Sequence, residues 1–299
     1  MVSRSEESLV SEFDIALLVR RLFRDKHLDD IPLRIKKQTP ESFDLKRVID
    51  GLLERGVLKK PTDVPYKGLF ERPGKETSVE QLVCFMDPVC YLSDLSAMQW
   101  HGITDRRPKS IQVTSARGTE WTSLVQFLME KDIKEGSYWT GGQPLKESAV
   151  IPSRGAWRTF PARIRGRPVE RRQDSSWPAK MDFLDNQGVR VATIGRTYLD
   201  MIRHPARCGG IQHVLDVFEE HGRRHRNLIV REVNESGTKL DKSRVGYILN
   251  ERLGVDVDSS PTLTAWLNTA VQRGGSRKLD AEADYSPTFS ERWCLSLNV

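Results

Sequence analysis

Apolar residues recur at helical spacing in the N-terminal part of the chain. One stripe follows Ser11, which together with Asp14 has the spacing of a capping box. It consists of Ile15, Leu18, Val19 and Leu22. A longer stripe follows Thr39-Pro40 and ends at Gly56, a residue suited to a helix C-terminus. It consists of Phe43, Leu45, Val48, Ile49, Leu52 and Leu53. Between the two, residues 31–37 are expected to form a short helix, in which Pro32 is tolerated only because it falls in the first turn.

The segment after the third predicted helix is expected to form a hairpin, with strands at residues 57–60 and 67–72 around a turn that contains proline. Helices followed by a hairpin are typical of a winged helix-turn-helix domain, which we place at residues 1–76. In that fold the third helix enters the major groove of DNA and the hairpin reaches the phosphates. The residues expected to contact DNA are Lys46, Arg47 and Asp50 on the helix and Lys59, Lys60, Lys67 and Arg72 on the hairpin.

Small helical units with a hairpin also serve as protein-protein modules, and a Lys-Arg pair on a helix is usually solvated. The hydrophobic pattern therefore leaves both interpretations open. DNA binding is favoured by the run Leu52-Leu53-Glu54-Arg55-Gly56-Val57-Leu58. This run is similar to the end of the recognition helix and the first wing strand in bacterial winged-helix regulators.

Residues 77–299 show a mixed pattern without a regular strand-helix-strand repeat. Helical spacing is found at residues 79–85, 95–100, 121–129, 196–202, 211–220, 242–252 and 263–271. Strands are expected at residues 110–114, 149–151, 160–164, 189–194 and 293–297. The predicted fold class is therefore α+β, with an N-terminal winged helix-turn-helix followed by a larger mixed α+β domain that is divided, as one option, near residues 195–205.

Composition is that of a soluble globular protein: 299 residues, 38% hydrophobic and 29% charged. No apolar run approaches the ~18 residues that a membrane span requires, and the N-terminal residues are polar rather than those of a signal peptide. We therefore expect a cytoplasmic protein with no membrane partner. Four cysteines, namely Cys84, Cys90, Cys208 and Cys294, lack the paired spacing of a zinc site and are expected to be reduced and mostly buried.

The net charge of +6 and the pI of about 9.1 agree with a polyanionic partner, and the positions of the charges carry more information. Residues 151–175 contain seven arginines against two acids, with Trp157 and Phe160 among them. Such a run either binds RNA or another anionic ligand or forms a solvated hairpin, and we weigh the two equally. A second basic cluster consists of Arg223, Arg224, Arg226 and Arg231.

Signals for catalysis are weak. Gly275-Ser276 followed by Asp280, Glu282 and Asp284 is similar to a nucleotidyltransferase motif, but the serine and the carboxylates are too close together. His221 and His225 have zinc-ligand spacing, but arginines surround them and the glutamate of a metalloprotease motif is missing. We therefore expect no enzyme activity, no cofactor and no metal. An RNA-binding accessory protein or a nucleic-acid-processing enzyme with a basic central groove remains the alternative.

Three blocks of the second domain resemble the AbiEi family of antitoxins. The first contains Tyr91-Leu92-Ser93, Ser96-Ala97, His101-Gly102-Ile103-Thr104 and Ile111-Gln112-Val113-Thr114. The second contains Arg196-Thr197, Asp200, Pro205 and Gly209-Gly210. The third contains Gly246-Tyr247-Ile248-Leu249, Leu279-Asp280 and Arg292-Trp293-Cys294-Leu295. The blocks follow the order of the family, although Tyr198 replaces a commoner leucine and the arginine run around 154–172 has no counterpart in the pattern.

The resemblance implies an antitoxin of a type IV toxin-antitoxin system that represses its own operon through the N-terminal domain. It also implies operator DNA as a partner and a nucleotidyltransferase-like toxin that is counteracted without a stable complex. Candidates for antitoxin activity or ligand binding are Arg163, Arg165, Arg167, Arg196 and Asp200. Arg196 and Asp200 also stand four residues apart, which suits a structural ion pair. His101-Gly102 has the composition of a helix C-terminus.

Overall fold

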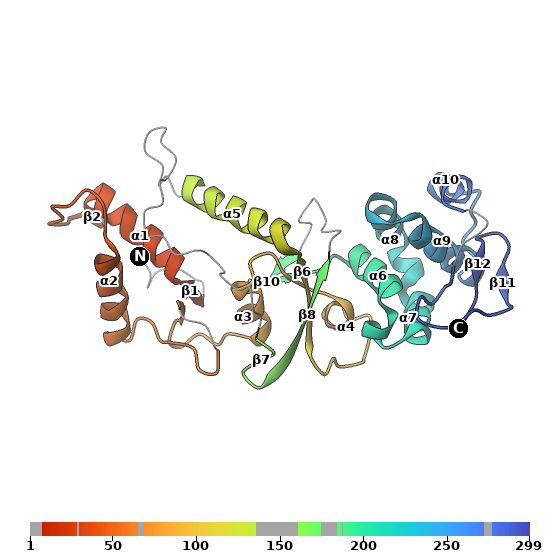
Figure 1. Cartoon of the computed structure of the whole chain (residues 1–299), viewed down its shortest axis with the longest axis horizontal. Coiled ribbons are helices and arrows are strands. Elements are labelled where there is room, and N and C mark those ends of the chain that lie inside the picture. Colours follow the sequence, from red (N-terminus) through yellow and green to blue (C-terminus); the bar gives the residue numbers. More distant parts are fainter. Residues whose placement is uncertain are drawn as a thin grey trace. The chain divides into compact units, whose positions relative to one another are not determined.

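The computed structural model describes residues 8–28, 30–64, 68–135, 161–174, 184–186, 188–271 and 277–299, which combine helices with short strands (Figure 1). This confirms the predicted mixture of α and β structure. The chain divides into two compact units. Unit 1 comprises residues 1–90, 115–169 and 173–175, and unit 2 comprises residues 91–114, 170–172 and 176–299. The predicted domain boundary near residue 76 falls inside unit 1, and as a boundary between folding domains it stays a prediction.

The first helix of unit 1, α1 (Glu12–Asp25), begins at the predicted capping box. The Asp14 backbone N–H donates to Ser11 Oγ at 3.1 Å, and the Ser11 backbone N–H donates to Asp14 Oδ2 at 2.8 Å. These two bonds satisfy amide groups that a helix N-terminus otherwise leaves without partners. One face of α1 packs against α2 (Ser42–Glu54). The buried residues of this core are Val10, Ile15, Ala16, Val19, Leu45, Ile49, Leu58 and Phe70.

The C-terminus of α2 forms a Schellman motif at the predicted glycine. Gly56 has a φ of 66° in the left-handed region, where glycine has no steric penalty. The Val57 N–H donates to the Leu52 carbonyl and the Gly56 N–H to the Leu53 carbonyl, both at 3.0 Å. Helix α2 therefore ends next to Gly56, as the sequence predicted.

The helix predicted at residues 31–37 is wrong. Residues 31 and 32 form strand β3 (Ile31–Pro32), which pairs antiparallel with β2 (His27–Leu28), and residues 33–37 are irregular. Pro32 has no N–H and biases the preceding residue toward an extended backbone. Ile31 is 64% exposed, so this segment has no apolar face against the core that could support a helix.

The predicted wing is only partly regular. Strand β4 (Leu69–Glu71) lies within the predicted second strand, but its regular antiparallel partner is β1 (Leu9–Ser11), which precedes α1. The predicted first strand, residues 57–60, is reduced to a single bridge in which Lys59 and Glu71 exchange two backbone hydrogen bonds of 2.8 Å. Strand β4, which pairs with β1 along one edge, thus has a single bridging residue, Lys59, on its other edge.

The rest of unit 1 contains α3 (Val79–Met86), α5 (Gly118–Glu135), β7 (Arg163–Ile164) and the first part of β8 (Arg167–Asp174). Ile133 of α5 is buried with Phe13 and Leu17 of α1. The buried Asp87 after α3 accepts hydrogen bonds from Ser115 Oγ at 2.6 Å and from Trp121 Nε1 at 2.9 Å. Strands β7 and β8 form a hairpin that confirms part of the strand predicted at 160–164, whereas the strand predicted at 149–151 lies outside the described residues.

Unit 2 begins with a sheet around β5 (Tyr91–Leu92). β5 pairs antiparallel with β6 (Ile111–Ala116), with Leu92 opposite Val113, and parallel with β10 (Val189–Val191). β10 pairs antiparallel with β9 (Leu184–Asn186). In the strand order β7-β8-β6-β5-β10-β9, unit 2 holds residues 170–172 of β8, residues 111–114 of β6, and strands β5, β10 and β9. Helix α4 (Asp94–Trp100) follows β5.

The larger part of unit 2 is helical. Its helices are α6 (Ile194–Arg203), the 3₁₀ helix η2 (Pro205–Cys208), α7 (Ile211–Val217), α8 (Arg223–Ser236), α9 (Lys239–Tyr247) and α10 (Pro261–Thr269). Two π-helical segments, η3 (Phe218–Gly222) and η4 (Ile248–Arg252), extend α7 and α9. The chain ends with a hairpin of β11 (Phe289–Ser290) and β12 (Leu295–Ser296). One core, including Tyr198, Phe218, Trp266 and Trp293, joins these elements.

The helices predicted in unit 2 are confirmed with altered ends, and helix α8 was missed. The strand predicted at 189–194 ends at Val191, because Ile194 already begins α6. The arginines of residues 223–231 had been considered only as a charge cluster, although Ile229 and Val233 of α8 are fully buried. All four cysteines are free and buried, as expected. In the described part of the chain, no helix is long and apolar enough to cross a membrane.

Candidate functional site

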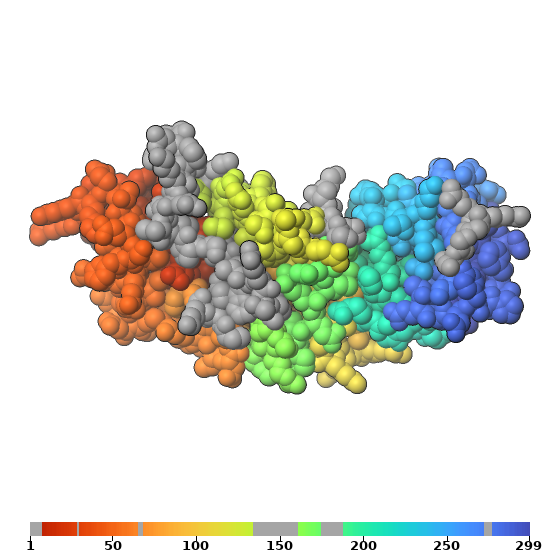
Figure 2. Space-filling view, viewed as in Figure 1, coloured from red at the N-terminus to blue at the C-terminus, as the bar shows by residue number. Residues whose placement is uncertain are grey.

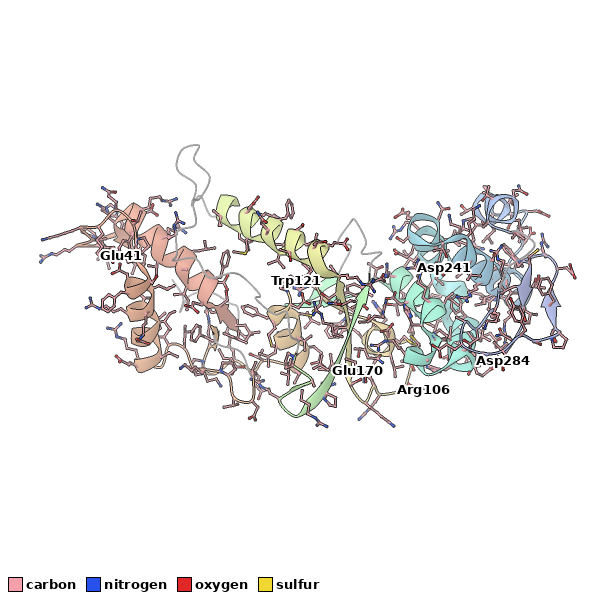
Figure 3. All side chains as sticks on the ribbon, in the orientation of Figure 1. Glu41, Arg106, Trp121, Glu170, Asp241 and Asp284 are labelled. Carbon is pink, nitrogen blue, oxygen red and sulfur yellow. The ribbon has the colours of Figure 1, made fainter. Side chains whose placement is uncertain are left out.

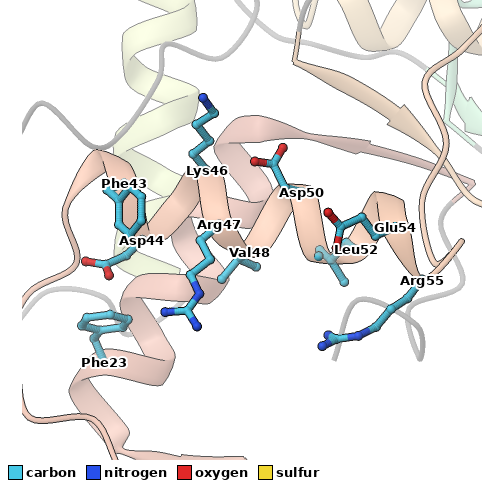
Figure 4. Close-up of a pocket in the computed structure, with 11 residues that line it drawn as sticks. Phe23, Phe43, Asp44, Lys46, Arg47, Val48, Asp50, Leu52, Glu54 and Arg55 are labelled. Carbon is cyan, nitrogen blue, oxygen red and sulfur yellow. The ribbon is translucent and has the colours of Figure 1, made fainter.

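The outward face of α2 carries the helix residues predicted to contact DNA. Lys46, Arg47 and Asp50 are exposed and line a depression of about 850 Å³ (Figure 4). Phe23 of α1 and Phe43 of α2 lie at one end of it, and Phe43 is 68% exposed. Because Leu45 and Ile49 turn toward the core, the charged positions of α2 are left to solvent.

Charges on this face balance. The cations that line the depression are Lys46, Arg47 and Arg55, and the anions are Asp44, Asp50 and Glu54. Asp44 accepts the Glu41 backbone N–H at 2.9 Å, which is the main reason that its pKa lies below the usual value. The face therefore has no strong net field, and any recognition of DNA here depends on where individual groups stand rather than on bulk attraction.

The hairpin residues predicted to reach phosphates differ in their surroundings. Lys59 and Lys60 are exposed, and Lys59 Nζ lies 3.6 Å from the carboxylate of the buried Glu71. Arg72 is only 7% exposed, so little of it is available for the predicted phosphate contact, which stays a prediction. Its backbone N–H donates to the Ser8 carbonyl at 3.0 Å, which extends the pairing of β1 with β4 and holds the residue within the unit. Lys67 lies outside the described residues.

The central arginines predicted to bind a ligand contact the protein itself. Arg165 and Gly166 form the turn between β7 and β8 with φ values of 49° and 77°, as in a type I′ turn. The Arg165 guanidinium donates to the Glu71 carboxylate and to the Thr77 carbonyl. Arg167 NH1 lies 2.7 Å from the Glu80 carboxylate, and Arg163 NH1 donates to the Gly166 carbonyl at 2.9 Å. Carboxylates of the protein thus relieve part of the mutual repulsion among these arginines.

A buried cluster of arginines and aspartates lies in unit 2. Asp94 begins α4 and Asp200 lies near the end of α6, and neither side chain is exposed. Arg172 NH2, from β8, lies 3.6 Å from Asp94 Oδ1 and 3.4 Å from Asp200 Oδ1. Arg196 Nε donates to Asp200 Oδ1 at 3.1 Å, and its side chain is 4% exposed. The predicted pair of Arg196 and Asp200 is therefore confirmed as an ion pair, inside a larger cluster.

A third arginine completes this cluster. Arg207 Nε, from η2, donates to Asp94 Oδ2 at 2.7 Å, and Arg207 NH1 lies 3.4 Å from the Glu170 carboxylate. Glu170, labelled in Figure 3, also accepts the hydroxyl of Ser110 at 2.6 Å. The cluster thus joins β8, α4, α6 and η2 by ion pairs, some of which are also charge-assisted hydrogen bonds and so are stronger than neutral ones.

The surroundings of the two buried aspartates are polar. Ser93 Oγ donates to Asp94 Oδ2 at 3.1 Å and accepts from Thr114 Oγ1 at 2.8 Å. Burial, together with the two aspartates, raises the pKa of the Cys208 thiol well above its usual value. Burial also raises the pKa of Glu232, against an opposing effect of Arg196. The cluster holds elements of unit 2 together, and its outermost side chains, Arg207 and Glu170, are 26% and 52% exposed.

Sequence reasoning found one pair of this cluster and missed the rest. Asp94 and Arg172 stand far from Asp200 along the chain, and Arg207 lies beyond the end of α6, so no spacing within one helix or strand connects them. The only sequence signal was that Asp94 stands between quoted residues of the first block and that Arg196 and Asp200 belong to the second. Asp94 has a φ of 52°, a left-handed conformation that is uncommon outside glycine and asparagine and that the surrounding bonds must maintain.

Histidines do not form a metal site among the described residues. His221 and His225 have ring centroids 6.5 Å apart, and no group of three potential ligands is found in that part of the chain. His225 Nδ1 instead shares a hydrogen bond of 3.2 Å with the Tyr198 hydroxyl. His101 Nε2 donates to the Ala192 carbonyl at 2.7 Å and, as predicted, follows the end of a helix. The Gly275-Ser276 motif lies outside the described residues.

Comparison with known proteins identifies the family. The model of the AbiEi antitoxin C-terminal domain matches residues 89–251, more than half of the chain. The chain belongs to the AbiEi antitoxin family. The matched region contains every member of the buried cluster, and the predicted resemblance is confirmed. Helix α2 lies before the matched region.

One solved structure with similarity is described as the crystal structure of RV2827C protein from Mycobacterium tuberculosis. It has a TM-score of 0.47 and 14% sequence identity, and the alignment covers 98% of this chain and 87% of that chain. No curated protein matches the sequence. Membership of the AbiEi family makes this chain an antitoxin of a toxin-antitoxin system.

Proposed function

We propose that this AbiEi antitoxin represses its own operon by binding operator DNA through unit 1. Helix α2 would lie in the major groove, with Lys46, Arg47 and Asp50 facing the bases, and Lys59 and Lys60 would lie near the phosphates. One observation carries the proposal. The side chains of Lys46, Arg47 and Asp50 are exposed on one helix, and no ion pair within the described residues holds them.

The chemistry of these side chains supports base recognition. Arginine and lysine donate to guanine, and a carboxylate accepts from the amino group of cytosine. The Schellman end of α2 and its packed inner face keep the helix rigid, so side chains on its outer face stand at defined positions. The balanced charge of the face limits binding to arbitrary DNA, which leaves selectivity to the pattern of donors and acceptors.

The partner toxin in this proposal is a nucleotidyltransferase-like enzyme, counteracted without a stable complex between the two proteins. The family membership of residues 89–251 supports an antitoxin role for this region. Roles of Arg163, Arg165, Arg167, Arg196 and Asp200 in that activity stay predictions. Arg165 pairs with Glu71, and Arg196 pairs with Asp200. Substitution of either arginine therefore alters the stability of the protein first, and it tests function only in a variant that is shown to be folded.

Operator binding is tested with the double variant Lys46→Gln and Arg47→Gln in the full chain. We expect its affinity for the promoter fragment to fall at least ~tenfold in gel-shift titrations at fixed salt, since each good base contact contributes about 1–3 kcal/mol. The matched control is Arg34→Gln with Lys36→Gln, which removes the same charge from exposed positions of unit 1 outside α2. Equal affinities of the two double variants for the promoter would refute the assignment of α2 as the recognition helix.

A further inference from the structure

Helix α8 presents an arginine surface that the contacts within the protein do not explain. Its inner side is buried through Ile229 and Val233, and α8 packs closely on α6. On the outer side, Arg224 and Arg231 are two helical turns apart and lie on nearly the same face, with Asn227 between them. Within the described residues, neither arginine forms an ion pair or hydrogen bond. Atoms of α8, sky blue in Figure 2, form part of the visible surface of unit 2.

The arginine surface is bordered by planar and apolar groups and, at its N-terminal end, by the exposed Glu220, whose Oε1 lies 3.6 Å from His221 Nε2. His221 and Leu228 follow the same side of the helix, at positions three and four residues from Arg224. The His221 side chain is 25% exposed, and Leu228 is 37% exposed. The His221 ring is tilted by 33° relative to that of His225, which the Tyr198 hydroxyl holds through a hydrogen bond. A rigid strip of rings and one aliphatic side chain thus runs beside the cations.

The backbone of α8 is held firmly, which makes this surface preorganised. Gly195 of α6 faces the Leu228 carbonyl oxygen so closely that a Cβ at this position would lie 2.5 Å from it. Arg223, at the start of α8, donates to the Leu253 carbonyl, which joins the helix to the end of η4. The backbone positions that carry the outer-face side chains are therefore fixed, so binding a ligand costs little backbone conformational entropy.

The composition of the surface distinguishes between classes of partner. Protein interfaces have an apolar core, whereas here Leu228 is the one large apolar side chain on the exposed side of α8. Interfaces with nucleic acids are more polar and more positively charged. A double helix offers mainly phosphates to such a surface, while a single strand also offers unstacked bases that bind planar side chains. The combination of arginines with an imidazole strip therefore favours a single strand.

We propose that α8 binds a single-stranded nucleic acid, with Arg224, Asn227 and Arg231 along the phosphates and His221 with Leu228 against a base. This site is independent of the proposed operator contact, which lies in unit 1 on a different helix. Glu235, one turn beyond Arg231, limits the surface at its C-terminal end, since a carboxylate repels phosphate. RNA and single-stranded DNA share this chemistry, and the experiment separates them.

The test measures the affinity of the full chain for fluorescent oligouridine RNA, oligothymidine DNA and a duplex of arbitrary sequence by anisotropy. For the variant Arg224→Gln with Arg231→Gln, we expect weaker binding of single strands and a salt slope of log K reduced by about 1.4, at roughly 0.7 per lost phosphate contact. For His221→Ala with Leu228→Ala, we expect about tenfold weaker binding with an unchanged salt slope, as for one lost stacking contact.

The matched control is Arg107→Gln with Arg292→Gln, two exposed arginines of unit 2 outside α8 whose removal changes the net charge equally. Circular dichroism of each variant confirms folding. Losses limited to the α8 variants support the site, and the preferred oligonucleotide identifies RNA or DNA. Equal losses in the control, no binding of single strands by the unaltered protein, or duplex binding that is as tight as single-strand binding and insensitive to His221→Ala with Leu228→Ala would each overturn it.

Discussion

The contribution of an ion pair to stability depends on how far its side chains are exposed, as two pairs in this protein show. Arg196 and Asp200 are four apart on α6, as are Arg21 and Asp25 on α1. The first pair is buried, with 4% and 0% of the side chains exposed, and the second is open, at 47% and 36%. Exposed pairs contribute little to the free energy of unfolding because water screens them. When the carboxylate of a buried pair is neutralised, the arginine stays buried without a counter-charge to compensate for its lost hydration.

The difference in burial predicts that the same substitution destabilises the protein much more at one pair than at the other. We expect Asp200→Asn to lower the free energy of unfolding by roughly 3 kcal/mol or more, because Arg196 and Arg172 then lose the charge that they share. Asp25→Asn, the control, should cost less than about 1 kcal/mol. Urea unfolding followed by circular dichroism measures both. A similar small loss for the two variants would show that the buried cluster is not held by charge.

At the scale of elements, close packing of helices depends on single glycines. Gly195 lies in α6 where that helix meets α8, and a Cβ there would approach the Leu228 carbonyl at 2.5 Å and Glu232 Cβ at 2.9 Å. The nearest of these atoms is backbone, which cannot move without shifting α8. Gly51 in α2 differs, since a Cβ there would meet only the tip of the Arg55 side chain at 3.8 Å.

Alanine at these two glycines should therefore have effects of opposite sign. Gly195→Ala is expected to destabilise the protein by about 1–3 kcal/mol through overpacking, in spite of the better helix propensity of alanine. Gly51→Ala is expected to stabilise it by up to about 1 kcal/mol, because only the propensity changes. Thermal unfolding of both variants measures the two effects. Stabilisation by Gly195→Ala would mean that α6 and α8 are not in close contact at this point.

At the scale of the whole molecule, the charged groups of interest fall on separate units. The exposed face of α2 belongs to unit 1, and the buried arginine cluster and the surface of α8 belong to unit 2. The region that matches the AbiEi family begins at residue 89, after α2. The proposed repressor and antitoxin activities therefore depend on different residues and should be separable by substitution.

We expect the Lys46→Gln and Arg47→Gln variant to lose repression of a promoter reporter and still protect cells from the cognate toxin. In size-exclusion chromatography, antitoxin and toxin should elute separately, because the proposed mechanism involves no stable complex. Expression of the variant from an unrelated promoter, at a level matched by immunoblot, controls for altered abundance. Loss of protection at equal abundance would place the antitoxin activity in α2, and a co-eluting complex would contradict the proposed mechanism.

Local signals in the sequence were reliable where all of their atoms lie within one turn or one helix. The capping box of Ser11 with Asp14, the Schellman glycine Gly56 and the pair of Arg196 with Asp200 each involve residues that a helix brings together by itself. The family blocks were likewise legible, because their order along the chain survives without any structure. Free, buried cysteines followed from composition and spacing.

Contacts between distant segments could not be read from the sequence. β4 pairs with β1, not mainly with the segment just before it, and the pairing holds Arg72 inside the unit. Arg172 reaches two aspartates from other elements, and the basic run of α8 contains two buried apolar residues that a charge pattern hides. Periodicity specifies which side of an element is apolar, but which partner covers that side depends on the path of the whole chain. The sequence thus determined individual helix caps, the mixture of α and β structure and the family, while the tertiary structure alone decided which arginines are buried as ion pairs and which face solvent.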